Sequence, residues 1–190
     1  MTRRCLLVID LLNEYLDRWE PDAVDRLISA ANRLVAAFHA CDLPVIFVRQ
    51  EFRPDLADAF LEMRDKAIHA TIAGTRGAAF HPALDRRSAA MEIVKKRYSA
   101  FFGTDLDRRL ERLGIEELTI AGINTHACIR MTAIDAYQRD YRVVLASEAI
   151  GSYDERHARV TLDYLDGKIA RLARLDDILP SLRLPASPTG

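Results

Sequence analysis

Three side chains of this sequence could act together in nucleophilic catalysis: the acid Asp10, the base Lys95 and the thiol Cys128. Asp10 and Lys95 close short apolar runs that are typical of buried strands, and Cys128 lies in the first helical turn after another such run. In an open parallel sheet, ligands bind outside the carboxyl ends of the strands. The three side chains are therefore expected at one rim of a sheet, where the acid could take the proton of the thiol.

Each of these residues also has a purely structural interpretation. An aspartate after a strand is often a turn residue, and a lysine at a strand end is usually a solvated charge. A free cysteine more often fills core space than attacks a substrate. The combination favours catalysis, because unrelated placements would not select one rim of the sheet.

The position of Cys128 adds a separate argument. With Thr125 as the N-cap of the following helix, Cys128 occupies the third helical position, where backbone amides lack partners and the helix dipole is positive. This environment, with Lys95 nearby, is expected to lower the pKa of the thiol. Cys5 lies inside an apolar run and Cys41 at a helix end, so both are interpreted as structural.

The elements that must position these residues alternate between apolar runs and amphipathic stretches. Continuously apolar runs, typical of strands buried on both faces, predict six strands: Arg4–Asp10, Pro44–Val48, Glu92–Lys95, Leu118–Gly122, Arg142–Ala146 and Lys168–Leu172. Apolar spacing and helix start signals predict helices over Pro21–Cys41, Asp58–Ala67, Thr104–Leu113, Thr125–Asp140, Glu155–Tyr164 and Leu175–Leu179. Thr104 and Asp107 resemble a capping box.

Alternating strands and helices imply an α/β fold of three layers, α/β/α, around a central, mostly parallel sheet of about six strands with Rossmann-type topology. Residues 1–184 are expected to form a single domain, and residues 185–190 a frayed tail. A chain of 190 residues can bury roughly 70% of the surface that its unfolded form exposes, which is enough for one large core.

The composition is that of an ordinary globular domain, and it excludes several classes of function. Apolar residues make up 49% and charged residues 29% of the chain, and 27 Lys and Arg against 28 Asp and Glu leave a net charge of -1. No excess of positive charge is available for nucleic acid or an acidic membrane.

The apolar run Cys5–Ile9 is too short for a signal peptide or a membrane span. Three cysteines without C-x-x-C spacing indicate no disulfide scaffold and no zinc module, so a cytoplasmic location is expected.

Three segments, taken together, carry a family resemblance. Val8–Asn13, Lys95–Phe101 and Gly122–Cys128 are similar to the signatures of the isochorismatase-like cysteine hydrolases, which include nicotinamidases and N-carbamoylsarcosine amidases. The resemblance extends from about Arg4 to Leu179, with the segments in the usual order and at the usual separations. As a set these segments are specific, whereas any one of them would be a weak signal.

The resemblance implies a catalytic triad of Asp10, Lys95 and Cys128. It also implies a non-proline cis peptide between Ile123 and Asn124. Such a bond would turn the Asn124 amide toward the Cys128 amide, so that both could donate to an oxyanion.

The function implied by the resemblance is hydrolysis of a C–N amide or carbamoyl bond of a small molecule. Asp10 would take the proton of Cys128, the thiolate would attack the carbonyl, and water would hydrolyse the resulting thioester. Two alternatives stay open. One is an isochorismatase-type vinyl-ether hydrolase, which needs the acid but no nucleophilic thiol. The other is a non-catalytic binding module of the same fold.

Nicotinamidases of this family usually bind a metal through an Asp-x-His unit after the second strand, but the corresponding stretch Arg49–Asp55 has no histidine. No metal and no cofactor are therefore expected. Tyr15, Phe52 and His126 are the predicted substrate contacts, because aromatic side chains near the rim could wall a pocket. His126 could equally be a surface residue of the first helical turn.

Substrate specificity is expected to reside in the segment Glu51–Ala90, before the third strand. The expected ligand is a small-molecule substrate, with no nucleic acid or membrane as partner. The resemblance further implies a homo-oligomer, a dimer or a tetramer.

Overall fold

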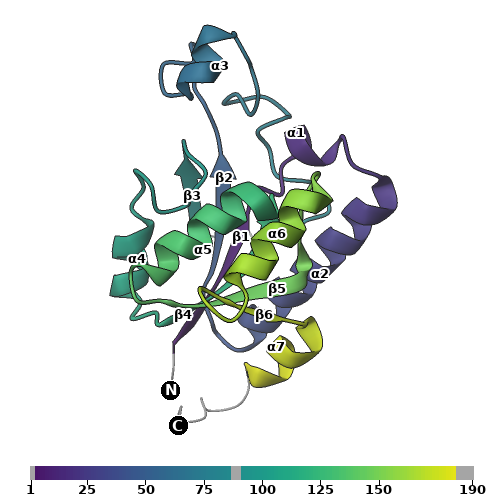
Figure 1. Ribbon diagram of the computed structural model, residues 1–190, viewed down its shortest axis with the longest axis vertical. Helices are drawn as coiled ribbons and strands as arrows, with labels where there is room; N and C mark the ends of the chain where they lie inside the picture. Colours follow the sequence, from purple (N-terminus) through teal and green to yellow (C-terminus); the bar gives the residue numbers. More distant parts are fainter. Residues whose placement is uncertain (1–2, 87–90, 183–190) are drawn as a thin grey trace.

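The computed structural model describes residues 3–86 and 91–182, and it confirms the three-layer α/β/α architecture (Figure 1). Six strands form one sheet: β1 (Arg4–Ile9), β2 (Val45–Gln50), β3 (Met91–Lys95), β4 (Glu117–Ile123), β5 (Arg142–Gly151) and β6 (Arg171–Ala173). The tail predicted at 185–190 lies outside the described residues.

The strands lie side by side in the order β3-β2-β1-β4-β5-β6, and every neighbouring pair is parallel. The chain winds outward from β1 to β3, returns to place β4 beside β1, and then continues outward to β6. The winding direction therefore reverses between β1 and β4. In open α/β sheets the crevice at the carboxyl ends of two such strands is where ligands bind.

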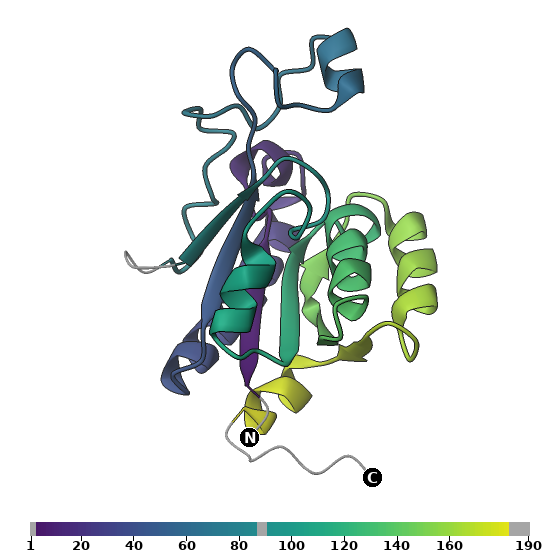
Figure 2. The same cartoon turned by 90° about the vertical axis from the view of Figure 1, so that its left-hand side faces the viewer.

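Helices cover both faces of the sheet. One face carries α1 (Asn13–Leu16), α2 (Pro21–Ala40) and α7 (Leu175–Ser181). The other face carries α4 (Leu106–Arg112), α5 (Arg130–Tyr137) and α6 (Glu155–Leu165), which lie in front of the sheet in Figure 1. The remaining helix, α3 (Leu61–Asp65), belongs to a segment that projects beyond the sheet, as Figure 2 shows.

The strand β1 explains why the predicted strands are continuously apolar. Leu6 and Val8 pack into the core beneath α2, whereas Cys5, Leu7 and Ile9 pack into the core beneath α4 and α5. Successive side chains of a strand point to opposite faces, so a strand covered on both faces has no polar position.

The helix α2 shows how the helices were recognisable. It begins at Pro21, a residue favoured at the first helical position. Its buried face consists of Val24, Leu27, Ile28, Ala30, Ala31, Leu34, Val35 and Phe38. Within residues 3–86 and 91–182, no helix combines the length and the apolar character that crossing a membrane requires.

Some predicted boundaries are wrong for local reasons. The sixth strand is Arg171–Ala173 rather than Lys168–Leu172, because the residues before it still donate backbone hydrogen bonds to Leu165 at the end of α6. The predicted capping box is also wrong. The carboxylate of Asp107 accepts a hydrogen bond from the Tyr141 hydroxyl at 3.1 Å instead of capping α4.

The helix predicted over Thr125–Asp140 is two elements. The first is a π-helical turn, η1 (Thr125–Ile129), and the second is α5, which ends at Tyr137. Asp140, with a φ of 63°, adopts the left-handed conformation in the turn that leads to β5.

Candidate active site

Asp10, Lys95 and Cys128 meet at the carboxyl ends of β1, β3 and β4. Asp10 and Lys95 have no exposed surface, and Cys128 is 5% exposed. Lys95 Nζ lies 2.7 Å from Asp10 Oδ2 and donates a hydrogen bond to Cys128 Sγ at 3.4 Å. The structure therefore brings together the three residues that the sequence singled out.

The ammonium group of Lys95 is fully engaged. Besides Asp10 and Cys128, it contacts the carbonyl oxygen of Arg97 at 3.1 Å. An ammonium carries three protons, so these three acceptors fix its position. Burial lowers the pKa of Lys95, but the charge of Asp10 and the hydrogen bonds to Asp10 and Cys128 outweigh burial, and the net pKa is raised. Lys95 is therefore a permanent cation.

Asp10 is held by the backbone of β2. Its Oδ1 accepts a hydrogen bond from the amide of Gln50 at 2.7 Å, and its own amide donates to the carbonyl of Val48 at 2.8 Å. The φ of Asp10 is 55°, in the left-handed region that aspartate tolerates better than most residues. This turn after β1 leaves the carboxylate between β2 and Lys95.

The thiol of Cys128 is neutral in this arrangement. Burial, and then the charge of Asp10, raise the pKa of Cys128 to about 12, against the opposing effect of Lys95. The predicted lowering of this pKa is therefore wrong. The reason is that the lysine does not compensate for the loss of water around a charged sulfur. A proton must leave the sulfur during the reaction, and Asp10 is the neighbouring base.

The π-helical turn η1 places Cys128 at the end of β4. The peptide bond between Ile123 and Asn124 is cis, as the resemblance implied. The carbonyl of Asn124 accepts hydrogen bonds from the amides of Ala127 at 3.0 Å and Ile129 at 3.2 Å. The chain therefore turns tightly around Asn124, and Cys128 follows four residues later.

The N-cap assigned to Thr125 is wrong. The residue that precedes η1 is Asn124, and its side chain makes no capping hydrogen bond. Thr125 instead donates from Oγ1 to the carbonyl of Gly151 at 3.0 Å. This contact ties the turn that carries Cys128 to the end of β5.

A cavity of about 740 Å³, here called the catalytic cavity, opens beside Cys128. Its walls come from α1, α3, η1 and the start of α5, and they include Tyr15 and His126, two of the predicted substrate contacts. A cavity of this size can hold a small ligand. Phe52, the third predicted contact, lies outside this lining. It is 1% exposed and packs with Leu56 and neighbouring apolar residues inside the projecting segment.

Sequence reasoning missed Gln50, the last residue of β2. Its side chain lines the catalytic cavity, and its Oε1 accepts a hydrogen bond from the Tyr15 hydroxyl at 2.7 Å. Within the described part of the chain its Nε2 is buried and has no hydrogen-bond partner. The available signal was its place at the carboxyl end of the strand next to β1.

His126 is held at the mouth of the catalytic cavity. Its Nδ1 lies 2.6 Å from the hydroxyl of Ser152, and its ring meets the ring of Tyr153 edge-on at 5.0 Å. Burial lowers the pKa of His126, although the charge of Asp154 partly opposes this effect. The imidazole is therefore neutral at pH 7.

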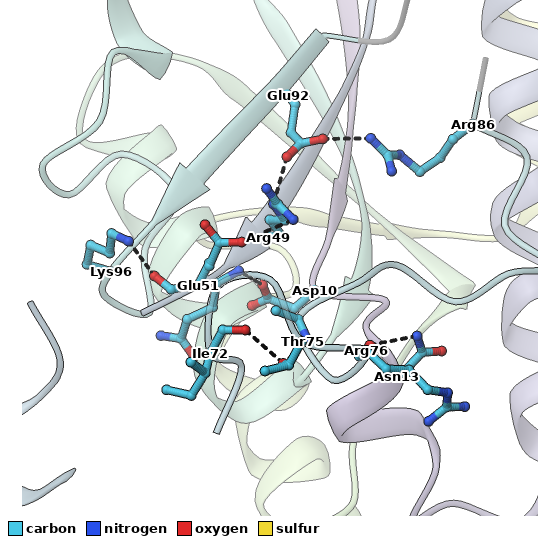
Figure 3. A network of polar contacts seen from close by, with 12 residues as sticks. Asp10, Asn13, Arg49, Glu51, Ile72, Thr75, Arg76, Arg86, Glu92 and Lys96 are labelled. Carbon is cyan, nitrogen blue, oxygen red and sulfur yellow. Dashed lines mark hydrogen bonds and ion pairs between the residues drawn. The ribbon is translucent and has the colours of Figure 1, made fainter. Parts of the chain in front are cut away.

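Ion pairs fasten the start of the segment predicted to set specificity. Lys96 Nζ donates to the carbonyl of Glu51 at 2.5 Å (Figure 3). It also lies 2.9 Å from the carboxylate of Asp58. Arg49 lies 3.2 Å from the carboxylate of Glu51 and 2.7 Å from that of Glu92. These contacts join the projecting segment to the ends of β2 and β3.

The residues at the end of β2 do not fit a metal ion. Across residues 3–86 and 91–182, no three His, Cys, Asp or Glu side chains are grouped as metal ligands. Where nicotinamidases carry Asp-x-His, the side chain of Gln50 bonds to Tyr15 and Phe52 packs among apolar side chains. The absence of a cofactor stays a prediction.

Comparisons with known proteins agree with the geometry. The isochorismatase domain family matches residues 4–177. The uncharacterized isochorismatase family protein YecD of Escherichia coli O157:H7 is 29% identical over 93% of this chain and 95% of its own. Maleamate amidohydrolase of Pseudomonas putida is 26% identical over 94% of this chain and 86% of its own.

The fold has solved counterparts. The crystal structure of an isochorismatase family protein from Desulfovibrio vulgaris matches with a TM-score of 0.85 and 28% identity, over 95% of this chain and 100% of that one. These matches confirm both the expected fold and the resemblance carried by the three sequence segments.

Proposed function

The chain belongs to the isochorismatase domain family, and from that membership we propose that it is a cysteine hydrolase acting on a C–N amide or carbamoyl bond of a small molecule. One observation carries the proposal. Lys95 contacts both the carboxylate of Asp10 and the sulfur of Cys128 beside a cavity of about 740 Å³. A nucleophile with an adjacent base at a cavity is the usual arrangement for covalent catalysis.

The first half of the proposed reaction forms a thioester. As the substrate enters, Asp10 takes the proton of Cys128, and the sulfur attacks the carbonyl carbon. The oxyanion accepts hydrogen bonds from the backbone amides of Asn124 and Cys128. The intermediate collapses with cleavage of the C–N bond, Asp10 gives its proton to the nitrogen, and the amine leaves.

The second half of the reaction releases the acid. Water attacks the thioester carbonyl and gives a proton to Asp10. The C–S bond then breaks, and the sulfur of Cys128 recovers that proton. Lys95 stays an ammonium throughout, and its charge stabilises the carboxylate and the thiolate in turn.

His126 is proposed to donate a hydrogen bond to the substrate. We propose that the Ser152 hydroxyl, which accepts a hydrogen bond from the amide of Asp154 at 3.2 Å, donates its proton to His126 Nδ1. In a neutral imidazole the other nitrogen, Nε2, then carries the hydrogen. His126 therefore favours a substrate that presents an acceptor, such as a carbonyl or carboxylate oxygen.

The proposal is tested with a panel of carboxamides, carbamoyl compounds and isochorismate. We expect ammonia or amine release from an amide or carbamoyl compound, and loss of that activity in Cys128→Ala. Cys41→Ala is the matched control and should keep full activity, because Cys41 lies at the end of α2. A slow substrate should add one acyl group to the protein, located by mass spectrometry on Cys128.

The alternatives give different results in the same panel. Pyruvate release from isochorismate that survives Cys128→Ala would identify a vinyl-ether hydrolase. No turnover of any panel member, with no acyl group added to Cys128, would favour a binding module. Full amidase activity in Cys128→Ala would show that the nucleophile is assigned wrongly.

The homo-oligomer also stays a proposal. Large apolar side chains are exposed, and exposed apolar surface often marks an interface. They include Leu61, Phe102 and Val160. Light scattering during size-exclusion chromatography would measure the mass, and a monomer of 21.5 kDa would contradict this proposal.

A further inference from the structure

A second cavity of about 430 Å³ adjoins the catalytic cavity. It is here called the Trp19 pocket. The two cavities share three lining residues: Tyr15, Asn124 and Tyr153. The Trp19 pocket takes no part in the chemistry proposed above.

The walls of the Trp19 pocket are aromatic. Tyr15, Trp19 and Tyr153 line it together, and most of its surface is apolar. The indole of Trp19 is backed by Gly151, where even a Cβ atom would lie 3.0 Å from the ring, and it packs on the core beneath α2. The rear wall is therefore fixed, whereas Tyr153, which is 72% exposed, forms the outer wall.

The charges of the Trp19 pocket are already paired. Among the described residues that line it, Glu14 and Arg18 carry charge, and they lie 3.2 Å apart as an ion pair. The guanidinium of Arg18 is largely in water, since its side chain is 78% exposed. An uncharged group fits such a pocket better than an ion.

Asn124 relates the pocket to the reaction. Its backbone amide is one of the two proposed oxyanion donors, and the residue lines both cavities. The scissile carbonyl carbon would therefore lie where the two cavities meet. An amide carbonyl carries two substituents, the acyl group and the nitrogen, and they diverge from this carbon. One can extend into the catalytic cavity and the other into the Trp19 pocket.

We propose that the Trp19 pocket is a substrate subsite for an uncharged, planar apolar group, such as an aromatic ring, attached next to the scissile amide. The proposal names the substrate class of the hydrolase proposed above and rests on that function. Aromatic walls in a pocket of this size suit a ring that packs edge-on or offset against Tyr153 and Trp19.

Trp19 allows the proposal to be tested without turnover, because it is the only tryptophan of the chain. The Cys128→Ala protein is titrated with phenylacetamide, with N-benzylacetamide and with acetamide, while tryptophan emission is recorded. The first probe carries its ring on the acyl side and the second on the nitrogen. We expect at least one ring-bearing probe to shift or quench the emission saturably, and acetamide at the same concentrations to leave it unchanged.

Two further variants, each added to Cys128→Ala, locate the bound ring. Tyr153→Ala removes an exposed wall, and it should weaken binding of the ring-bearing probe about five- to tenfold. Ala70→Leu enlarges a side chain that lines only the Trp19 pocket, and it should weaken binding at least as much. Tyr137→Ala is the matched control, because Tyr137 is an exposed tyrosine on α5 that lines neither cavity.

The outcomes separate this inference from the proposed function. If neither ring-bearing probe changes the emission of Trp19, or if Tyr153→Ala and Ala70→Leu bind as tightly as the control, the subsite is refuted. This holds even when the unaltered protein hydrolyses amides. If a ring-bearing probe binds as expected but the protein hydrolyses no amide, the subsite stands and the hydrolase fails.

Discussion

Replacing Asp10 by asparagine is expected to have opposite effects on two reactions of Cys128. Hydrolysis should be lost, because Asp10 is the proposed base and general acid–base catalysis contributes about 10²–10⁴ in rate. Alkylation of the thiol should become faster. It needs only the thiolate, and after burial the charge of Asp10 is the largest cause that raises the pKa of Cys128 to about 12.

The size of the second effect follows from the contacts of Lys95. Its Nζ lies 2.7 Å from Asp10 Oδ2 and 3.4 Å from Cys128 Sγ, so the oxygen and the sulfur are at most about 6 Å apart. At an effective dielectric constant of about 20, two negative charges about 6 Å apart repel by about 3 kcal/mol. Removing that repulsion raises the thiolate population about a hundredfold. A less basic thiolate is also about eightfold less nucleophilic, so the net rate should rise about tenfold.

The assay is iodoacetamide labelling at pH 8, with the peptide that contains Cys128 quantified by mass spectrometry against the peptide that contains Cys41. Asp17→Asn is the matched control, because it removes a surface carboxylate that pairs with Arg76. Labelling of Cys128 in the control should stay within about twofold of the unaltered protein, as expected for exposed ion pairs. If folded Asp10→Asn is labelled no faster than the unaltered protein, the electrostatic reasoning is refuted.

Three further predictions concern stability and titration. Lys95→Met leaves a buried carboxylate unpaired, so the free energy of unfolding in urea at pH 8 should fall by about 3–5 kcal/mol; a loss below about 1 kcal/mol would contradict the buried pair. Gly122→Ala places a Cβ 1.9 Å from the carbonyl oxygen of Ile9 and should cost more than about 4 kcal/mol. Gly103→Ala, also at positive φ but with nothing within 4 Å, should cost only about 1–2 kcal/mol in the same urea titration. Burial lowers the pKa of His126, so the midpoint of its NMR titration should lie below about 6.5. A midpoint above that value would contradict a lowered pKa.

The fold was predictable because the strands are buried on both faces. Continuous apolar runs such as Cys5–Ile9 have one simple explanation in a chain of alternating strands and helices. The boundaries of the strands were harder to predict than their existence. The strand β5 runs from Arg142 to Gly151, well past its apolar core, because its register against β4 shifts between Ile120 and Gly122. A register shift leaves no mark in hydrophobic periodicity.

The three candidate catalytic residues were predictable by position, but the charge state of the thiol was not. The positions follow from one rule, that parallel strands end at the same rim. The pKa of Cys128 depends on how completely the thiol is removed from water, and that depends on packing from several elements. A helix start and a lysine, both visible in the sequence, indicated a lower pKa, whereas burial to 5% exposure raises it.

The residues that sequence reasoning missed or misplaced lie on segments distant in the chain. Gln50 was missed because its role depends on a hydrogen bond to Tyr15 beside Asp10, between residues far apart in the sequence. Phe52 shows the opposite error. It is near the rim in sequence, but the projecting segment folds on its own small core and withdraws the ring from the cavity.

The buried cluster suggests why a neutral resting thiol suits this chemistry. With the proton on Cys128, the cluster holds one anion, Asp10, and one cation, Lys95; with the proton on Asp10, the thiolate replaces the carboxylate and the net charge is unchanged. In both arrangements the anion lies beside the ammonium of Lys95. Its Nζ is 2.7 Å from Asp10 Oδ2 and 3.4 Å from Cys128 Sγ. Losing the proton to water would instead leave two anions beside one cation in a buried cluster, which is costly. Burial therefore favours proton transfer between Asp10 and Cys128, the transfer that thioester formation requires, over loss of the proton to water.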